Sequence, residues 1–153
     1  IDIDEECQQY ESDRTKIFIG DQGDVSFLRN VKAKIPRIDI IIDDGSHRAK
    51  DQKTTFEEMY YHLKMPGVYL IEDVELNYWK NKDLNSPDNF MTHMKNKIDE
   101  LNIRKTMPAK IAQSYPFKDT EVRFTNSTNN ISFYDNVVVL EKKQMSKAKE
   151  IRK

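Results

Sequence analysis

Acidic side chains stand directly after two apolar runs of the sequence, and one of these places also carries a histidine. Asp43 and Asp44 follow the run IDIII, and His47 comes three residues after Asp44. Glu72 and Asp73 follow the run VYLI. Carboxylates gathered in one place repel one another and lose hydration, so such a cluster favours a cation or a polyhydroxyl ligand. The pattern therefore predicts a binding site rather than a packed core.

The elements that would position these side chains alternate between strands and helices. We expect strands at Thr15–Gly20, Arg37–Asp43 and Val68–Asp73, and helices at 24–34, 51–64 and 90–102. The helices follow from apolar residues spaced three or four apart, and the β-branched density of Arg37–Asp43 suits a strand buried on both faces. This alternation is typical of a parallel α/β sheet.

The second half of the sequence is less regular. We expect two strands, Thr120–Asn126 and Ile131–Lys143, joined by the polar turn Ser127–Asn130 as an antiparallel hairpin that closes the sheet. A polar loop covers 81–89. Residues 1–143 are expected to form a single domain, and the polar tail 144–153 to fray.

The composition excludes several classes of partner. The 153 residues are 37% hydrophobic and 33% charged, and 25 basic and 26 acidic residues leave a net charge of −1. We therefore expect neither nucleic acid nor a membrane surface as a partner. No apolar run approaches the roughly 18 residues of a membrane span, and nothing resembles a secretion signal, so we expect a cytoplasmic protein. Cys7 is the only cysteine and is expected to be inert.

Ligands of open parallel sheets bind at the carboxyl ends of the strands, where loops and helix N-termini meet. Asp2 and Asp4 close the first apolar fragment, and Asp21 follows the run IFIG. We expect these acids to face the same edge of the sheet as the two acidic pairs above.

These residues also carry a resemblance to a known family. The stretch IDDGSHRAKDQKTTFEEMYYHLKMPGVYLIEDVELNYW resembles class I S-adenosylmethionine-dependent methyltransferases, specifically the magnesium-dependent macrolide-sugar O-methyltransferases. IFIGDQGDVSFL and ISFYDNVVVLEK are similar to further segments of that family, so the match runs from about Ile1 through Lys142. The resemblance implies a Rossmann-like sheet, mostly parallel, with a C-terminal antiparallel hairpin. It also leads us to expect that the family's first strand and glycine-rich loop are lacking.

The resemblance assigns roles to the acids of the two pairs. Asp44, Glu72 and Asp73 match the carboxylates that hold Mg²⁺, and His47 matches the general base. The chemistry agrees, since Mg²⁺ prefers hard oxygen ligands and makes a nearby acceptor hydroxyl more acidic. An imidazole three residues beyond such a ligand is placed to take the proton.

The cofactor residues implied by the resemblance come from the other strand ends. Asp2 falls where an acid grips the ribose of S-adenosylmethionine, and Asp21 and Gln22 fall at its adenine end. Asp43 is assigned to cofactor binding with them. For Asp21 and Asp43 taken singly, an N-cap of the following helix is the structural alternative.

Other residues admit simpler interpretations. His47 alone would be a solvated loop histidine, and His62 and His93 are expected to be surface residues of helices. Tyr78 and Trp79 either line an acceptor pocket or pack under a loop.

We therefore expect an O-methyltransferase that acts on a hydroxyl of a sugar or another polyol small molecule. A non-catalytic interaction module and a Mg²⁺-dependent phosphoryl-handling domain are the alternatives. The sequence leaves open whether the chain forms a homo-oligomer.

Overall fold

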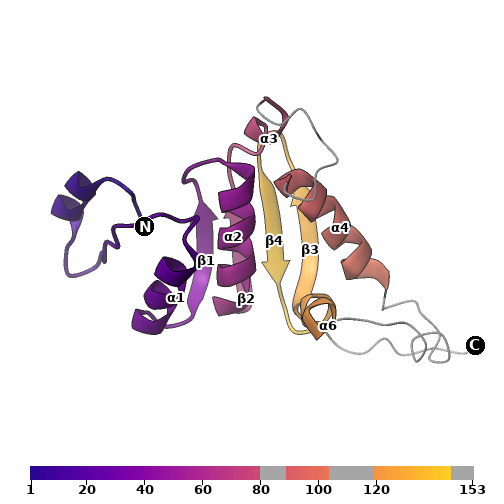
Figure 1. The fold of residues 1–153 in the computed structure, drawn as a ribbon. Coiled ribbons are helices and arrows are strands. Elements are labelled where there is room, and N and C mark those ends of the chain that lie inside the picture. The colour runs from indigo at the N-terminus through magenta and orange to yellow at the C-terminus, as the bar shows by residue number, and fades with distance from the viewer. Residues whose placement is uncertain (80–88, 104–118, 146–153) are drawn as a thin grey trace, which may run out of the picture.

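The structure is a computed structural model, and it describes residues 1–79, 89–103 and 119–145. Four strands form one mixed sheet in the order β1-β2-β4-β3. Their bounds are β1 Ile38–Asp43, β2 Leu63–Ile71, β3 Thr128–Phe133 and β4 Val138–Lys142. β1 and β2 are parallel, whereas β4 is antiparallel to both β2 and β3. The predicted α/β fold with a C-terminal antiparallel hairpin is confirmed (Figure 1).

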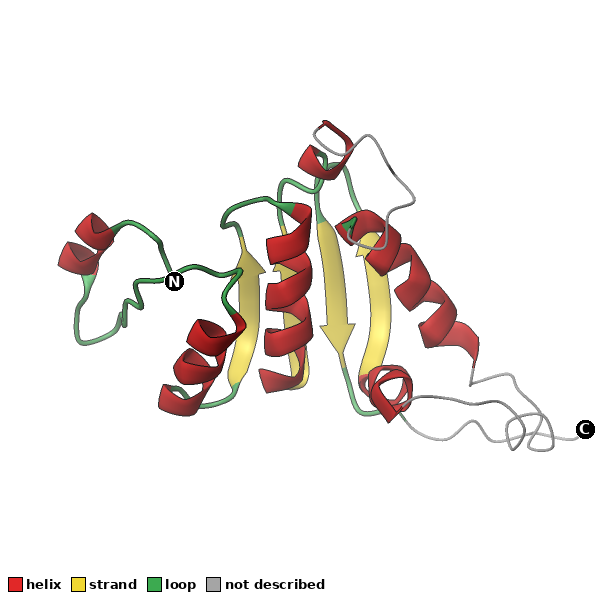
Figure 2. Ribbon diagram, in the orientation of Figure 1, coloured by secondary structure: helices red, strands yellow, loops and turns green. Residues whose placement is uncertain are grey.

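The helices follow the order α1 Val25–Lys34, α2 Ala49–Met59, α3 Leu76–Trp79, α4 Phe90–Ile103 and α6 Asp119–Ser127. Two 3₁₀ helices, η1 Glu5–Tyr10 and η2 Tyr60–His62, complete the described elements. In Figure 2 the helices α2 and α4 lie in front of the sheet. The helices predicted at 24–34, 51–64 and 90–102 are confirmed with shifted ends, because the chain leaves α2 at Met59 and enters β2 at Leu63.

The core lies between the sheet and these helices, and aromatic rings dominate it. Phe56 of α2 contacts the rings of Tyr60, Tyr69, Phe90 and Phe124 at centroid distances of 4.9 to 6.5 Å. These five rings come from α2, η2, β2, α4 and α6, so one cluster holds the sheet and the helices together. The Tyr60 hydroxyl lies 2.7 Å from Thr128 Oγ1, which satisfies both buried groups.

Strand β1 is at the edge of the sheet, and the prediction that it is buried on both faces is wrong for the described residues. Ile40 and Ile42 are each 61% exposed, whereas Ile41 packs against the core and Asp43 is buried. Successive side chains of a strand point to opposite faces, and only one face of β1 is covered by described elements. The isoleucine run therefore marks a half-covered strand.

The segment Thr15–Gly20, expected to be a strand, forms only isolated bridges. Ile19 pairs in parallel with Asp2, through Asp2 N donating to Phe18 O at 3.1 Å and Gly20 N donating to Asp2 O at 2.8 Å. This ribbon lies beside β1 without joining the four-stranded sheet (Figure 1). Asp2 is thus carried by this separate paired segment, and Asp21 follows directly after it.

The C-terminal prediction is right about the hairpin and wrong about its position. Thr120–Asn126 lies within helix α6, so no strand forms there. The hairpin turn falls at 134–137, where Tyr134 N donates to Val137 O at 2.8 Å and Asn136 has a φ of 60°. The predicted turn Ser127–Asn130 instead covers the end of α6 and the start of β3. The polar loop predicted at 81–89 lies outside the described residues except for Asn89, and so does the tail beyond Met145.

Candidate active site

The parallel pair β1 and β2 brings two acidic strand ends to the same edge of the sheet. Asp43 lies in register with Ile71, and Glu72 N donates to Asp43 O at 3.0 Å. Asp44 follows directly on the end of β1, and Asp73 lies two residues beyond the end of β2. The sequence expectation that the two acidic pairs meet is therefore confirmed.

Asp44, His47 and Asp73 form a compact cluster of possible metal ligands. Each residue offers one ligand atom, and these atoms lie within 4.8 Å of one another. His47 Nε2 is 3.6 Å from Asp73 Oδ2 and 4.0 Å from Asp44 Oδ1. The two carboxylates are partly open to solvent, whereas the imidazole is largely covered. Two carboxylate oxygens and one imidazole nitrogen are a donor set that a divalent cation accepts.

The backbone of this cluster has an uncommon conformation. His47 has a φ of 54° and Asp73 a φ of 49°, so both residues lie in the left-handed region. Non-glycine residues adopt it at a cost and mainly where surrounding contacts enforce it. Such residues concentrate at functional sites, which supports a functional interpretation of this loop pair.

Glu72 does not join the cluster, although the sequence places it among the metal ligands. Its main chain is fixed on both sides, because its N–H donates to Asp43 O and its carbonyl accepts from Gln52 Nε2 at 3.1 Å. The residue is half-buried at the end of β2. The structure thus brings together three of the four residues that the sequence assigns to the metal and the base.

Asp43 lies beneath the cluster and is buried. Its carboxylate accepts from Gln22 Nε2 at 2.9 Å and from the Tyr69 hydroxyl at 3.3 Å. Burial raises the pKa of Asp43 to about 6, although both hydrogen bonds oppose the shift. Asp43 therefore faces protein partners and is not the N-cap of the next helix, which is Arg48.

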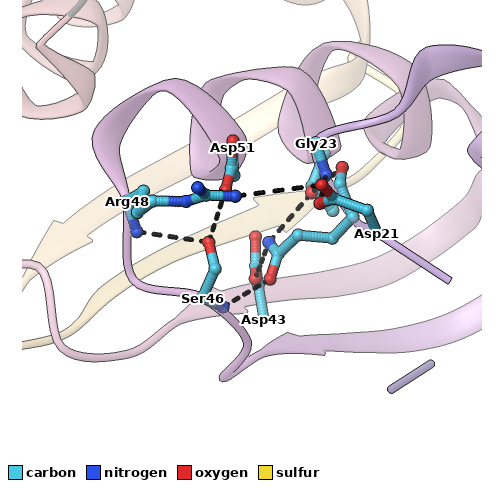
Figure 3. Close-up of polar contacts among 8 residues, drawn as sticks. Asp21, Gly23, Asp43, Ser46, Arg48 and Asp51 are labelled. Carbon is cyan, nitrogen blue, oxygen red and sulfur yellow. Dashed lines mark hydrogen bonds and ion pairs between the residues drawn. The ribbon is translucent and has the colours of Figure 1, made fainter. Parts of the chain in front are cut away.

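A network of polar contacts holds the loop between β1 and α2 (Figure 3). Ser46 N donates to Gln22 Oε1 at 2.6 Å, and Ser46 Oγ donates to Asp51 Oδ2 at 2.7 Å. Arg48 Nε donates to the same Asp51 oxygen at 2.6 Å, and its Nη2 lies 3.8 Å from Asp21 Oδ2. Arg48 and Asp51 carry no role in the sequence prediction. The one sequence signal for the role of Asp51 in holding this loop is its position in the motif that begins with DDGSH.

Asp2, Asp21 and Gln22, predicted to bind the cofactor, line one cavity of about 200 Å³. The same cavity is lined by Asp44, Gly45, Ser46 and Arg48, so it adjoins the loop of the metal cluster. Asp2 accepts from Asp4 N at 2.9 Å, and this bond, with a second from Cys7, lowers the pKa of Asp2. The Asp21 carboxylate accepts from Gly23 N at 2.7 Å and does not cap α1, whose N-cap is Asp24.

The remaining residues singled out by sequence fall outside this site. His93 is not a surface residue: its ring packs against Phe56 and Phe90, and its Nε2 is buried with no hydrogen-bond partner in the part of the chain that the structure describes. His62 is half-buried and its Nε2 lies 3.0 Å from Pro36 O. Tyr78 and Trp79 are exposed on α3, next to residues that the structure does not describe.

Comparison with known proteins gives several related O-methyltransferases. The chain is 28% identical over 140 residues to demethylmacrocin O-methyltransferase of Streptomyces fradiae, a match that covers 88% of this chain and 35% of that protein. It is 38% identical over 66 residues to mycinamicin VI 2''-O-methyltransferase of Micromonospora griseorubida, which covers 43% of this chain and 16% of the relative. The chain is related to this group of O-methyltransferases. The resemblance predicted from the sequence is confirmed.

The solved structures agree with the group of O-methyltransferases found by sequence. The MycE methyltransferase from the mycinamycin biosynthetic pathway, in complex with Mg, SAH and mycinamycin VI, matches with a TM-score of 0.75 and 25% identity. That match covers 94% of this chain and 35% of the MycE chain. The chain thus spans about a third of the length of these relatives. No model of a known protein family matches it. Within the described residues, no helix is long and apolar enough to cross a membrane.

Proposed function

We propose that this chain supplies the metal-binding and proton-accepting part of a Mg²⁺-dependent O-methyltransferase. The observation that carries the proposal is the meeting of Asp44, His47 and Asp73 at the ends of two parallel strands. One relative is named an O-methyltransferase of a rhamnosyl tetracenomycin and another an O-methyltransferase of mycinamicin VI, and one solved relative contains Mg and SAH. We assign a hydroxyl of a sugar or similar small molecule as the methyl acceptor.

Asp44 and Asp73 would hold Mg²⁺, because carboxylate oxygens are the ligands that this ion prefers. Glu72 stays a proposed third ligand, since it adjoins Asp73, although its carboxylate lies outside the cluster. When bound, Mg²⁺ would orient the acceptor and stabilise negative charge that develops on its hydroxyl. His47 would accept the proton of that hydroxyl, and its Nε2 already faces both carboxylates.

The cavity beside the cluster supports a cofactor site on the same loop. Asp2 presents a carboxylate whose lowered pKa keeps it ionised and able to accept hydrogen bonds from ribose hydroxyls. Asp21 and Gln22 line the same cavity, together with Gly45 and Ser46 of the loop. We assign S-adenosylmethionine to this cavity.

The phosphoryl-handling alternative lacks support in the described residues. Phosphate chemistry needs a cation directed at the phosphate. Arg48 is the cation that lines the cavity beside Asp44, and it is engaged by Asp51 and Asp21. Its guanidinium therefore binds these two carboxylates rather than an incoming phosphate.

Calorimetric titration of the chain with Mg²⁺ tests the metal assignment. Asp44→Asn and Asp73→Asn should each weaken binding by about tenfold or more, since each removes a charged ligand. Asp39→Asn is the matched control, because Asp39 lies on the same strand but pairs with Lys64 far from the cluster. Equal Mg²⁺ affinity in all four proteins would contradict the proposal.

Methyl transfer can be tested in a chimera that carries residues 1–153 in place of the matching segment of a structural relative. Transfer to a sugar hydroxyl should stop when EDTA removes the metal and return when Mg²⁺ is added. Full activity in metal-stripped protein would exclude the carboxylates from the mechanism.

A further inference from the structure

Every hydrogen-bonding group of the Gln22 side-chain amide has a partner within the protein. Its Nε2 donates to Asp43 Oδ1 at 2.9 Å and to Thr55 Oγ1 at 3.0 Å, and its Oε1 accepts from Ser46 N at 2.6 Å. A primary amide has two N–H groups, and here both are engaged, as is its oxygen. The side chain therefore joins the end of β1, helix α2 and the loop between them.

The loop is shaped to receive this amide. A Cβ atom at Gly45 would lie 1.7 Å from Gln22 Oε1, so any other residue at position 45 would displace the Gln22 amide from this contact. Gly45 has no positive φ, which means that the glycine is required here for close approach rather than for its backbone conformation. Gln22 and Gly45 are thus complementary.

One partner of Gln22, Ser46, lies in the short loop that joins two members of the cluster. Ser46 lies between Asp44 and His47, and it is held at its N–H by Gln22 and at its hydroxyl by Asp51. The next residue, His47, is in the left-handed region, which costs a non-glycine residue about 1 kcal/mol or more. Contacts on both sides of Ser46 enforce that conformation.

We infer that Gln22 is a positioning residue for the metal cluster: it fixes the loop Gly45–His47 against β1 and so sets Asp44 and His47 relative to Asp73. This inference rests on the proposed function. It differs from the role at the adenine end of the cofactor that the sequence resemblance implies. The two roles lead to different outcomes, because a positioning residue acts on the metal and an adenine contact acts on the cofactor.

The test uses variants that exchange the donor at position 22 with the acceptor at position 43. Gln22→Met keeps the size of the side chain but removes all three bonds. Gln22→Glu keeps the acceptor for Ser46 N but sets a carboxylate against the Asp43 carboxylate. In the double variant Gln22→Glu/Asp43→Asn, the amide at position 43 can donate to the carboxylate at position 22 and still accept from the Tyr69 hydroxyl.

Two measurements on the intact chain follow the loop and the metal separately. Hydrogen exchange of the Ser46 amide reports the contact with Gln22, and titration with Mn²⁺ as a probe reports the cluster. We expect both single variants to exchange faster at Ser46 and to bind Mn²⁺ roughly 10- to 100-fold more weakly, as for other partners that orient ligands. The double variant should regain most of the lost affinity.

Phe124→Leu is the control for a general loss of stability, since Phe124 is buried in the core far from the loop. It should lower the melting temperature and leave Mn²⁺ affinity unchanged. The inference is overturned if Gln22→Met keeps Ser46 protected, or if the double variant remains as weak as Gln22→Glu. It is also overturned if Gln22→Met weakens S-adenosylmethionine binding while Mn²⁺ affinity is preserved. Failure of the unaltered chain to bind Mn²⁺ would contradict the proposed function instead, and Ser46 exchange would still decide the role of Gln22.

Discussion

His47 combines three properties at a single residue: a strained backbone, a covered imidazole and two facing carboxylates. Its Nδ1 is buried and has no hydrogen-bond partner among the described residues, whereas Nε2 faces Asp44 and Asp73. A solvated loop histidine would have water at both nitrogens. This geometry leaves Nε2 as the nitrogen that can take a proton from an acceptor held by the cluster.

Replacing His47 by alanine should separate catalysis from binding. In the active chimera, His47→Ala should lower turnover by roughly 10²-fold or more, because a general base contributes that much. Affinity for S-adenosylmethionine should change little. His62→Ala is the control, since His62 lies near Pro36, away from the cluster. A variant that binds the cofactor tenfold worse yet turns over normally would reassign His47 to binding.

His93 should make the stability of the folded chain depend on pH. Burial lowers the pKa of His93 to about 4 from 6.5, with repulsion from Lys97 and Lys53 adding to the shift. Between these values the unfolded chain binds a proton that the folded chain does not, so stability falls as the pH drops from about 6.5 to 4.

His93→Phe should remove this dependence, because the aromatic contacts with Phe56 and Phe90 can persist without a titrating group. Urea unfolding at pH 7 and at pH 5 measures it: the unaltered chain should lose more stability between the two than the variant does. Equal losses would assign the acid sensitivity to other groups.

The meeting of Asp44 with Asp73 could be predicted from the sequence because it follows from parallel pairing of two apolar runs. The part played by Gln22 could not. Its three partners come from residues 43, 46 and 55, and nothing in the local sequence indicates that groups 21 to 33 residues away will enclose its amide. Only the glycine at position 45 hinted at a close approach.

Among the elements, α6 shows why local pattern misleads. Thr120–Asn126 alternates apolar and polar residues as a strand would, yet it is helical. Phe124 enters the aromatic cluster, and Thr125 Oγ1 donates to the carbonyl of Glu100 on α4 at 2.6 Å. Packing against α4 therefore overrides a modest β preference. The true turn carried its own signal, since Asp135-Asn136 is a pair that favours two-residue hairpin loops.

A buried pair of amides joins α2, α3 and α4. Asn77 Nδ2 donates to Gln52 Oε1 at 2.9 Å, and Asn77 Oδ1 accepts from Phe90 N at 3.2 Å. Gln52 in turn donates to the carbonyl of Glu72. The end of β2 is therefore tied to the start of α4.

Asn77→Ala should lower the free energy of unfolding by about 2 kcal/mol or more, since it leaves at least two buried polar groups unpaired. Asn102→Ala is the matched control, because Asn102 is exposed and its side-chain bond in the described residues goes to Ile98 O of its own helix. Chemical denaturation of both variants gives the comparison. Similar losses would show that the buried pair does not hold these elements together.

At the scale of the whole molecule, the segment with Asp2 and the sheet are separated by a groove. It has a volume of about 440 Å³ and is lined mainly by apolar residues, among them Phe18, Ile40 and Ile42. Asp2, proposed to bind the cofactor, is on this segment, and its main-chain bonds in the described residues go to Phe18 and Gly20. This part of the proposed cofactor site is thus held through residues 18–20 and not by the four-stranded sheet.

We therefore expect residues 1–153 alone to bind S-adenosylmethionine weakly or not at all. Tight binding requires several contacts held in place together, and ordering the Asp2 segment reduces the net affinity. Calorimetric titration of the isolated chain would measure it. A micromolar dissociation constant would show that the contacts supplied by this chain suffice.

The loop Gly45–Ser46 forms a wall shared by the two proposed ligand sites: it lines the cavity with Asp2 and Asp21, and Asp44 and His47 of the cluster stand on either side of it. Two ligands that order the same segment cannot be thermodynamically independent. If Mg²⁺ tightens the hold on S-adenosylmethionine by some factor, the cofactor must tighten the hold on Mg²⁺ by that same factor. The order in which the two ligands are added would then not change the final occupancy of either site. A chain that lacks one ligand would bind the other more weakly.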